Sequence, residues 1–560
     1  MPQNQKNNAF AASWGDYNEI IQEWVVRCHK TNLIKRLWAK DPTLWKKKVS
    51  EQNEITNRLG WLQAVEKMVK SVGELTAFGN EIKEEGFKHV VLLGMGGSSL
   101  GAEVFQNVFG NAPGYPELLI LDSTDPARVS DVEKSIDLAK TVFVLSSKSG
   151  GTIEPNAAFK YFFEKVKIVN ANTGHQFIAI TDPGTLLDKL AKSRHFRRIF
   201  STPEDVGGRF SVLTYFGLVP AVLIGVDVSE IVKKALEMVM HSSAEEEPEE
   251  NSALILGIAM AVLAESGRNK LTIVTPEGLE SFGDWAEQLV AESTGKEEMG
   301  VVPIVRESLA KPELYGKDRF FVALSCDELP DEKQTQNLKV LAKAGHPVLT
   351  LKMKNRASLG AEFYRWEVAT AVACSLMKIN CFDQPDVQSA KEKTTWILKK
   401  IEMGQGLSMS APKRTLESVF EDLAVGDYVA LLAFLPARPS VVKCLESLRL
   451  KVREYTKRTA TVGIGPRYLH STGQLHKGGP NSAIFILVTT EHSETLAIPG
   501  EKYNFKELEL AQALGDLEAL ESKERSVCHV HLPGISDKEL DAFSVLFENV
   551  LKAQHAVPAN

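Results

Sequence analysis

Short apolar runs alternate with segments of helical spacing along most of this chain. Runs at 90–93, 118–121, 142–145 and 177–180 are each followed by a stretch in which apolar residues recur every three or four positions. Strands that alternate with helices are typical of a parallel, doubly wound sheet. We therefore predict an α/β domain over residues 87–240.

The same alternation resumes after an acidic, proline-broken stretch at 242–251, which we interpret as a linker or helix boundary. Runs at 271–274, 321–324 and 348–351 predict a second α/β domain over 252–403. Runs at 429–434, 484–488 and 527–532 predict a further C-terminal α/β region over 404–560, which starts with a loop at 404–412. Residues 1–86 show helical spacing without strand patterns, so we expect a helical N-terminal region.

Composition narrows the class of protein. The chain has 560 residues, 44% of them hydrophobic, and a formal net charge of −7, which argues against nucleic acid or an anionic membrane as the main partner. Its six cysteines form no Cys-x-x-Cys pair, as expected for reduced thiols. The start is polar and no apolar run is long enough to cross a bilayer. We predict a cytoplasmic protein.

Two turns rich in glycine and hydroxyl groups follow predicted strands, at 94–101 (Gly-Met-Gly-Gly-Ser-Ser-Leu-Gly) and 147–152 (Ser-Lys-Ser-Gly-Gly-Thr). Free backbone N–H groups at a helix start attract phosphate, and glycine lets the backbone approach it. The first turn only partly matches the Gly-x-Gly-x-x-Gly motif of dinucleotide-binding folds, in which Asp122 would be the acidic residue that binds the ribose. No P-loop pattern occurs. We interpret the pair of turns as a site for a small phosphate, and tight turns without a ligand are the alternative.

A candidate for chemistry lies at 285–296. Gln288 and Glu292 are four residues apart, which places them on one face of a helix near its end at 293–295. A carboxylate there can act as a general base, whereas an ordinary amphipathic helix with solvated acids is the alternative. A second pattern, His529 and His531, offers two imidazoles on one strand face, but it lacks a third metal ligand nearby, and we favour a half-exposed strand.

Five motifs then occur in order, at 94–101, 147–154, 207–211, 288–296 and 384–391. Together they resemble the glucose-6-phosphate isomerase family, over roughly residues 88–395. The resemblance implies two sugar-isomerase (SIS) domains. The remaining chain, including 465–479, resembles the isomerase half of transaldolase/glucose-6-phosphate isomerase fusions.

The resemblance implies roles for individual residues. Glu292 matches the base that moves a proton between C2 and C1 through a cis-enediolate, and Arg209 matches the arginine beside that intermediate. Lys391 and a histidine match the groups that open the sugar ring. The implied substrate-binding residues are Gly97, Ser98, Ser147, Lys148, Ser149, Thr152, Gln288, Gln384 and, in a supporting role, Glu154.

The histidine departs from the family's order. It is usually found between the segments of the base and the lysine, but between Glu292 and Lys391 this chain has only His346, in an Ala-Gly-His-Pro turn. His476 has a family-like context and follows Lys391, so we predict it as the ring-opening histidine, with His470 as runner-up. In the family this residue comes from the partner subunit, which implies a homodimer.

We therefore expect an isomerase that interconverts glucose 6-phosphate and fructose 6-phosphate by proton transfer, without a redox cofactor or an obligatory metal. A metal-assisted hydride shift would need clustered His, Glu and Asp ligands that the spacing does not display. Two alternatives stay open: a related SIS isomerase for mannose 6-phosphate or an aminosugar phosphate, and a catalytically silent sugar-phosphate sensor.

Overall fold

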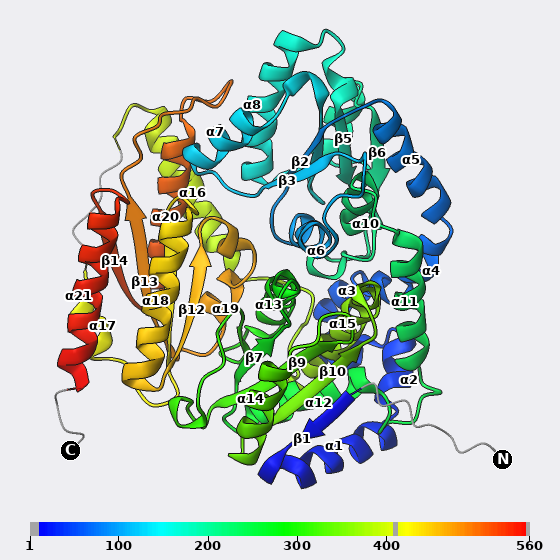
Figure 1. Cartoon of the computed structure of the whole chain (residues 1–560), viewed down its shortest axis with the longest axis vertical. Helices are drawn as coiled ribbons and strands as arrows, with labels where there is room; N and C mark the ends of the chain where they lie inside the picture. Colours follow the sequence, from blue (N-terminus) through cyan, green and yellow to red (C-terminus); the bar gives the residue numbers. More distant parts are fainter. Residues whose placement is uncertain (1–9, 407–412, 556–560) are drawn as a thin grey trace.

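The chain folds around three separate β-sheets with helices on their faces (Figure 1). The computed structural model describes residues 10–406 and 413–555. Part of the predicted loop at 404–412 lies outside the described residues.

The first sheet has five parallel strands in the order β3-β2-β4-β5-β6. It consists of β2 (His89–Leu93), β3 (Glu117–Leu121), β4 (Thr141–Ser146), β5 (Phe177–Thr181) and β6 (Arg198–Ser201). Its connecting helices are α6 (Leu100–Phe109), α7 (Pro126–Ser135), α8 (Ile153–Val169) and α9 (Leu186–Ser193). Strand order reverses between β2 and β4, and in such sheets a crevice forms outside the carboxyl ends of the strands at that point.

The second sheet has the order β1-β10-β9-β7-β8. Its parallel strands are β7 (Lys270–Val274), β8 (Val302–Ile304), β9 (Arg319–Cys326) and β10 (Val348–Met353), and β1 (Phe10–Ser13) pairs antiparallel with β10. The helices of this region are α12 (Ser252–Glu265), α13 (Glu280–Thr294), α14 (Glu332–Lys343) and α15 (Leu359–Met377).

The third sheet belongs to the C-terminal region and is again parallel, in the order β12-β11-β13-β14. Its strands are β11 (Tyr428–Phe434), β12 (Thr459–Ile464), β13 (Ala483–Thr490) and β14 (Ser526–Leu532). The helices from residue 387 onward are α16 (Val387–Glu402), α17 (Leu416–Phe420), α18 (Pro439–Thr456), α19 (Gly473–Gly478), α20 (Phe505–Ser522) and α21 (Asp537–His555).

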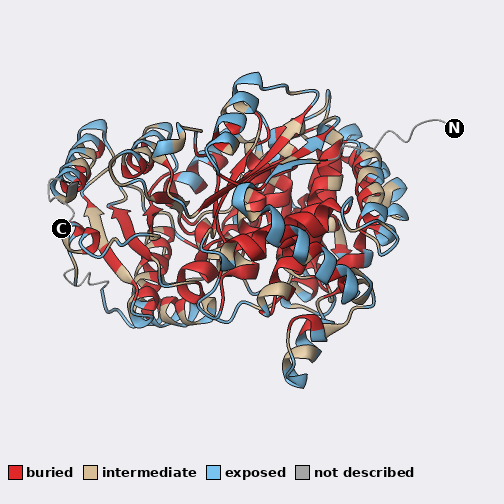
Figure 2. Cartoon of the chain, turned by 90° about the horizontal axis from the view of Figure 1, so that it is seen from below, coloured by how far each residue is buried: buried red, intermediate tan, exposed pale blue. Residues whose placement is uncertain are grey.

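The largest core lies between the first two sheets and is built mainly from helices. α12 is apolar on all sides, as expected for a helix with no solvent face, and it packs against α15. Both helices are almost entirely buried, and Figure 2 shows many buried residues in the middle of the molecule. The other helices of this part are α1 (Asn18–Lys30), α2 (Leu33–Trp38), α3 (Val49–Thr56), α4 (Ala64–Val69), α5 (Val72–Glu84), α10 (Tyr215–Leu223) and α11 (Val228–His241).

The structure confirms the α/β class and the parallel sheets, and it corrects the N-terminal prediction. Residues 1–86 are not purely helical, because β1 extends the second sheet. Its four residues, Phe-Ala-Ala-Ser, are too few to show an alternating pattern. The acidic stretch at 242–251 does form a helix boundary, since Asn251 caps α12 by accepting a hydrogen bond from the N–H of Leu254.

Within the described residues, none of the helices has both the length and the apolar composition that a membrane span requires. All six cysteines are free thiols, and five of them are buried.

Candidate functional site

The predicted loops meet the C-terminal region at the carboxyl end of β2. A short helical turn, Gly96–Ser98, follows β2 and touches two other segments. A Cβ atom on Gly96 would lie 2.6 Å from the carbonyl oxygen of His470, and one on Gly97 would lie 2.2 Å from that of Gly208. Only glycine permits such close approach, so these positions hold three segments together at the reversal point of the first sheet.

The two hydroxyl-rich turns are adjacent. Ser146 donates a hydrogen bond to the carbonyl oxygen of Ser98 at 3.0 Å, which ties the end of β4 to the first turn. In the second turn, Ser147 Oγ accepts from the N–H of Gly150 at 3.1 Å and lies 3.3 Å from Thr152 Oγ1. Thr152 directly precedes α8, whose first N–H groups face this turn. Hydroxyls and helix N–H groups together make a neutral cradle for an anion.

Lys148 does not supply free charge to this cradle. Its ammonium forms an ion pair with Asp182 and donates hydrogen bonds to the carbonyl oxygens of Pro203 and Glu204, both at 3.2 Å. Ser149 is exposed, and its hydroxyl accepts from the N–H of Gly151 at 3.2 Å. Lys148 therefore holds the turn against the neighbouring strand, and the anion-binding capacity comes from hydroxyl and N–H donors.

The candidate base lies on the last turns of α13, as its spacing predicted. Gln288 Nε2 donates to Glu292 Oε2 at 3.1 Å and to the carbonyl oxygen of His470 at 2.7 Å. The side chain of Glu292 keeps 13% of its surface exposed, so it can reach a molecule in the crevice. Gln288 thus orients the carboxylate and joins it to the C-terminal region.

Arg209 places a fixed positive charge beside that carboxylate. Its Nη1 is 3.3 Å from Glu292 Oε1, and its own side chain is only 4% exposed. Nε donates to Ser293 Oγ at 2.8 Å, Nη1 to Gln384 Oε1 at 2.9 Å, and Nη2 to the carbonyl oxygen of Asp383 at 3.0 Å. A guanidinium held on every side keeps its position while charge develops on a neighbouring group.

His470 lies on the same site from the C-terminal region. Its Nε2 is 2.9 Å from Glu154 Oε1, and Gln512 Nε2 donates to the same oxygen at 2.6 Å. Burial alone would raise the pKa of Glu154, but the charge and hydrogen bond of His470, with a smaller contribution from Lys391, hold that pKa below its ordinary value. Glu154 is thus an ionised carboxylate that orients an imidazole. Lys391 is exposed near the start of α16.

His476 does not join this group. Its side chain is 3% exposed on α19, and its ring packs against Tyr468 and Phe485 at centroid distances of 5.9 and 5.3 Å. Nδ1 is buried without a hydrogen-bond partner among the described residues, and burial with two nearby cations lowers the pKa of the ring well below its usual range. His476 thus packs against aromatic rings away from this group, whereas His470, the runner-up, contacts Glu154.

The remaining histidine patterns also have other roles. His346 is 8% exposed and makes edge-to-face contacts with Tyr315 and Phe321, next to the start of β10 in the second sheet. His529 and His531 each lie 2.8 Å from Thr489 Oγ1 rather than around a shared ion site.

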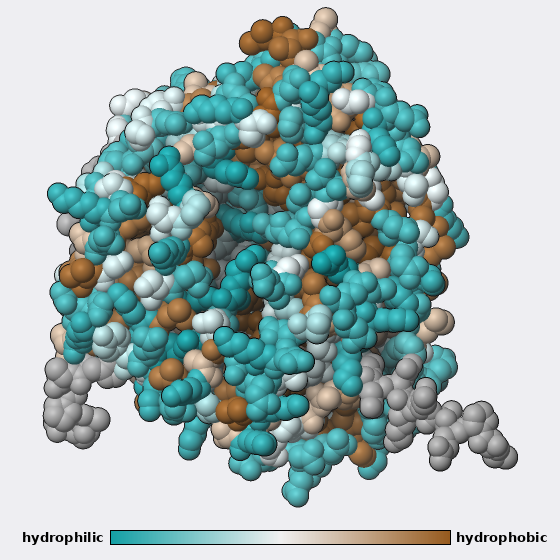
Figure 3. All heavy atoms as spheres, in the orientation of Figure 1, coloured by the Kyte–Doolittle hydropathy of each residue, from teal (hydrophilic) through white to brown (hydrophobic). Residues whose placement is uncertain are grey.

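A cleft opens next to Ser471, where the three regions meet, and its lining does not include Glu292, Arg209 or His470. It has a volume of about 720 Å³, and its walls include Asp122, Arg467, Ser471 and Glu287. Figure 3 shows the corresponding face hollowed near its middle, with hydrophilic residues around the opening. Asp122, considered above as a ribose acid, forms an ion pair with Arg467 at 3.4 Å instead.

Two residues of the site have no counterpart in the sequence prediction. Gln512 lies on α20 and Ser293 lies one residue after the candidate base. Ser293 falls inside a quoted motif and could have been singled out there. Gln512 carries no local signal, because it lies within an ordinary helical pattern about 360 residues from Glu154.

Comparison with known proteins gives a consistent result. Residues 47–305 match the family described as phosphoglucose isomerase. A glucose-6-phosphate isomerase from Methanocaldococcus jannaschii is 30% identical over 348 residues, covering 56% of this chain and 85% of the relative. One from Carboxydothermus hydrogenoformans is 30% identical over 387 residues, covering 59% and 82%. A solved glucose-6-phosphate isomerase from Chlamydia trachomatis has the same fold, with a TM-score of 0.58 at 19% identity over 70% of this chain and 88% of that one.

Proposed function

The chain belongs to the glucose-6-phosphate isomerase family, and from that premise we propose which residues of its crevice interconvert glucose 6-phosphate and fructose 6-phosphate. The phosphate binds at the two adjacent turns, to the hydroxyls of Ser98, Ser147, Ser149 and Thr152 and to the N–H groups that start α8. Lys148 supports the second turn through Asp182.

Glu292 is the base of this proposal. It removes the proton from C2 of the open-chain aldose, the electron pair forms the cis-enediolate, and the same carboxyl group returns the proton to C1. Arg209 stabilises the negative charge that develops on the enediolate oxygens, and its bonds to Ser293 and Gln384 keep it in place without rearrangement. The observation that carries the proposal is the 3.3 Å contact of Glu292 with Arg209 beside the phosphate turns.

Ring opening moves one proton from the anomeric hydroxyl to the ring oxygen, with no net gain or loss. We assign the donation to the ring oxygen to His470, because Glu154 holds its ring at the site and Gln512 in turn donates to Glu154. Lys391 acts electrostatically on Glu154 and is the second candidate for this step.

The C-terminal region therefore contributes to the site within one chain. The resemblance implied a homodimer in which the histidine comes from the partner, whereas His470 of the same chain meets that need here. A homodimer stays a prediction, to be checked by analytical ultracentrifugation, as does the cytoplasmic location, to be checked by cell fractionation. We expect turnover of mannose 6-phosphate or an aminosugar phosphate to be slower than that of glucose 6-phosphate, in a direct comparison of kcat/KM.

The decisive test compares two single-atom changes on the same segment. E292Q should lose about 10²-fold or more in kcat, the range supplied by a positioned base, while still binding arabinonate 5-phosphate as an enediolate mimic. E297Q is the matched control, since Glu297 is exposed and pairs with Lys46. Near-normal turnover by E292Q would overturn the assignment of the base.

A further inference from the structure

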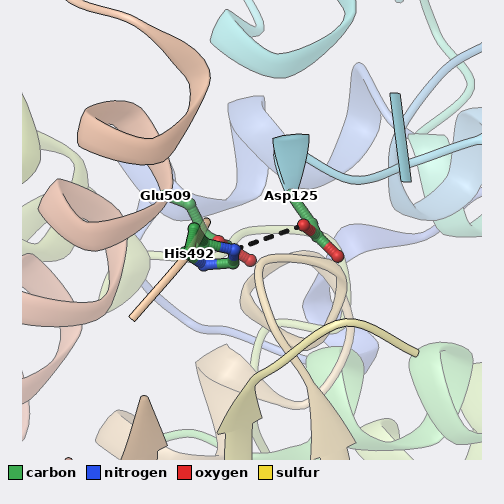
Figure 4. Close-up of side chains that lie close together, drawn as sticks. All are labelled: Asp125, His492 and Glu509. Atoms are coloured by element: carbon green, nitrogen blue, oxygen red, sulfur yellow. Dashed lines mark ion pairs between the residues drawn. The ribbon is translucent and has the colours of Figure 1, made fainter. Parts of the chain in front are cut away.

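Two buried carboxylates and a partly buried imidazole form a compact group outside the isomerase site. Asp125, His492 and Glu509 each offer one ligand atom, and these atoms all lie within 4.8 Å of one another. Figure 4 shows the carboxylate of Asp125 facing the ring of His492, with the side chain of Glu509 close to that ring. His492 Nδ1 is 3.5 Å from Asp125 Oδ1, and its Nε2 is 2.6 Å from Glu509 Oε2.

The group joins two regions that are far apart in sequence. Asp125 caps α7 in the first domain by accepting from the N–H of Ala127 at 2.9 Å. His492 follows β13 and Glu509 lies on α20, both in the C-terminal region. In that sheet the strand order reverses between β11 and β13, so the carboxyl end of β13 is where a parallel sheet is expected to bind a ligand.

The negative charge of this group is not balanced by its own members. Asp125 and Glu509 are 2% and 1% exposed, and within the described residues Asp125 Oδ2 and Glu509 Oε1 are buried without a hydrogen-bond partner. Two buried carboxylates face at most one positive charge on His492. The nearby ammonium of Lys506 forms its ion pair with Glu491 and donates to the carbonyl oxygen of His492 at 3.3 Å. Unpaired buried oxygens of this kind cost free energy unless a donor or a cation meets them. Against the effect of burial, Arg438 lowers the pKa of Asp125 through its charge rather than through a hydrogen bond to that carboxylate.

A small cavity adjoins the group. It has a volume of about 10 Å³, and its lining includes His492, Glu509, Thr490, Lys506 and His531. This is room for roughly one water-sized body. One imidazole with two carboxylates is a donor set that suits Zn²⁺ or Mn²⁺, whereas Mg²⁺ and Ca²⁺ prefer oxygen alone.

We propose that Asp125, His492 and Glu509 bind a divalent transition-metal ion that fastens the C-terminal region to the first domain. The ion is structural and takes no part in the isomerisation. Glu509 precedes Gln512 by one helical turn, and Gln512 bonds to both Thr124 and Glu154, so the ion also steadies the helix that orients His470.

The test uses the full chain and needs no activity measurement. The purified protein is dialysed against a chelator and then titrated with ZnCl₂, MnCl₂ or MgCl₂, while the melting temperature and the bound metal are measured. We expect one equivalent of Zn²⁺ or Mn²⁺ to bind and the melting temperature to rise by several degrees, with no response to MgCl₂.

Two variants and one control assign the binding to these residues. E509Q preserves the shape of the side chain and H492A removes the imidazole, and both should lose the bound metal and the thermal shift. H529N is the control, because His529 lies on the neighbouring strand β14, contacts Thr489 and is not among the residues that line the cavity. The proposal is overturned if the unaltered chain binds neither metal, or if E509Q responds like the unaltered chain. Those results would instead indicate a protonated His492 bridging two carboxylates.

Discussion

The choice between two histidines is the sharpest prediction that the structure allows. His470 is held by Glu154 at 2.9 Å at the site, whereas His476 is packed between Tyr468 and Phe485. A positioned proton donor contributes about 10²- to 10⁴-fold in rate, which corresponds to ~3–5 kcal/mol of transition-state stabilisation. We expect H470A to lose that factor in kcat for glucose 6-phosphate.

The matched variant is H476L. It removes a buried nitrogen that has no partner among the described residues and replaces the ring with an apolar group of similar size. An unsatisfied buried polar group costs about 1–3 kcal/mol, so H476L should keep its kcat and unfold at the same or a higher temperature. A coupled assay for fructose 6-phosphate, together with thermal unfolding of both variants, decides the point. A loss of turnover in H476L with normal turnover in H470A would refute our assignment.

Two further predictions concern the scaffold. G97A should abolish activity, because a Cβ atom on residue 97 would lie 2.2 Å from the carbonyl oxygen of Gly208. G208A is the control and should keep kcat and KM, because a Cβ atom on residue 208 would meet no atom within 4 Å. Equal activity of the two variants would contradict this prediction. E307Q should lower the free energy of unfolding in urea by about 3–5 kcal/mol, because it leaves the buried Arg319 without its charged partner. Burial raises the pKa of Glu307, but Arg319 nevertheless holds that pKa below its ordinary 4.5. The ion pair therefore stabilises the fold above about pH 4.5, and this stabilisation is lost as the pH falls through the pKa of the folded state. If the loss of stability caused by E307Q did not shrink at low pH, the ion pair would not be its cause.

Much of the fold could be predicted from the sequence because its central strands are buried on both faces. Such strands stand out as continuous apolar runs, and this was enough to locate ten of the strands in the three sheets. The prediction missed β1, β6, β8 and β12, which are short or carry few large apolar residues. All four lie at a sheet edge, but burial alone does not explain the miss, since β8 is fully buried and has only three residues.

The residues of the candidate site also fall into two groups, those that local spacing could predict and those that depend on contacts between distant segments. Glu292 and Gln288 could be placed from helical spacing alone, since both depend on one local element. The histidine could not, because its role depends on whether the ring is packed in a core or faces a crevice, and His470 and His476 are six residues apart in one motif. Gln512 and Glu509 belong to contacts between distant segments, which a single sequence does not reveal.

The four-residue strand β1 has a consequence for the handling of this protein. It pairs with β10 through Phe10 to Ser13 and so covers the backbone groups at that margin of the second sheet. Removing residues 1–14 would leave residues 348–351 with free hydrogen-bonding groups, a surface on which a strand of another molecule could assemble. N-terminally shortened forms should therefore self-associate as their concentration rises, even though no residue of the isomerase site has been altered.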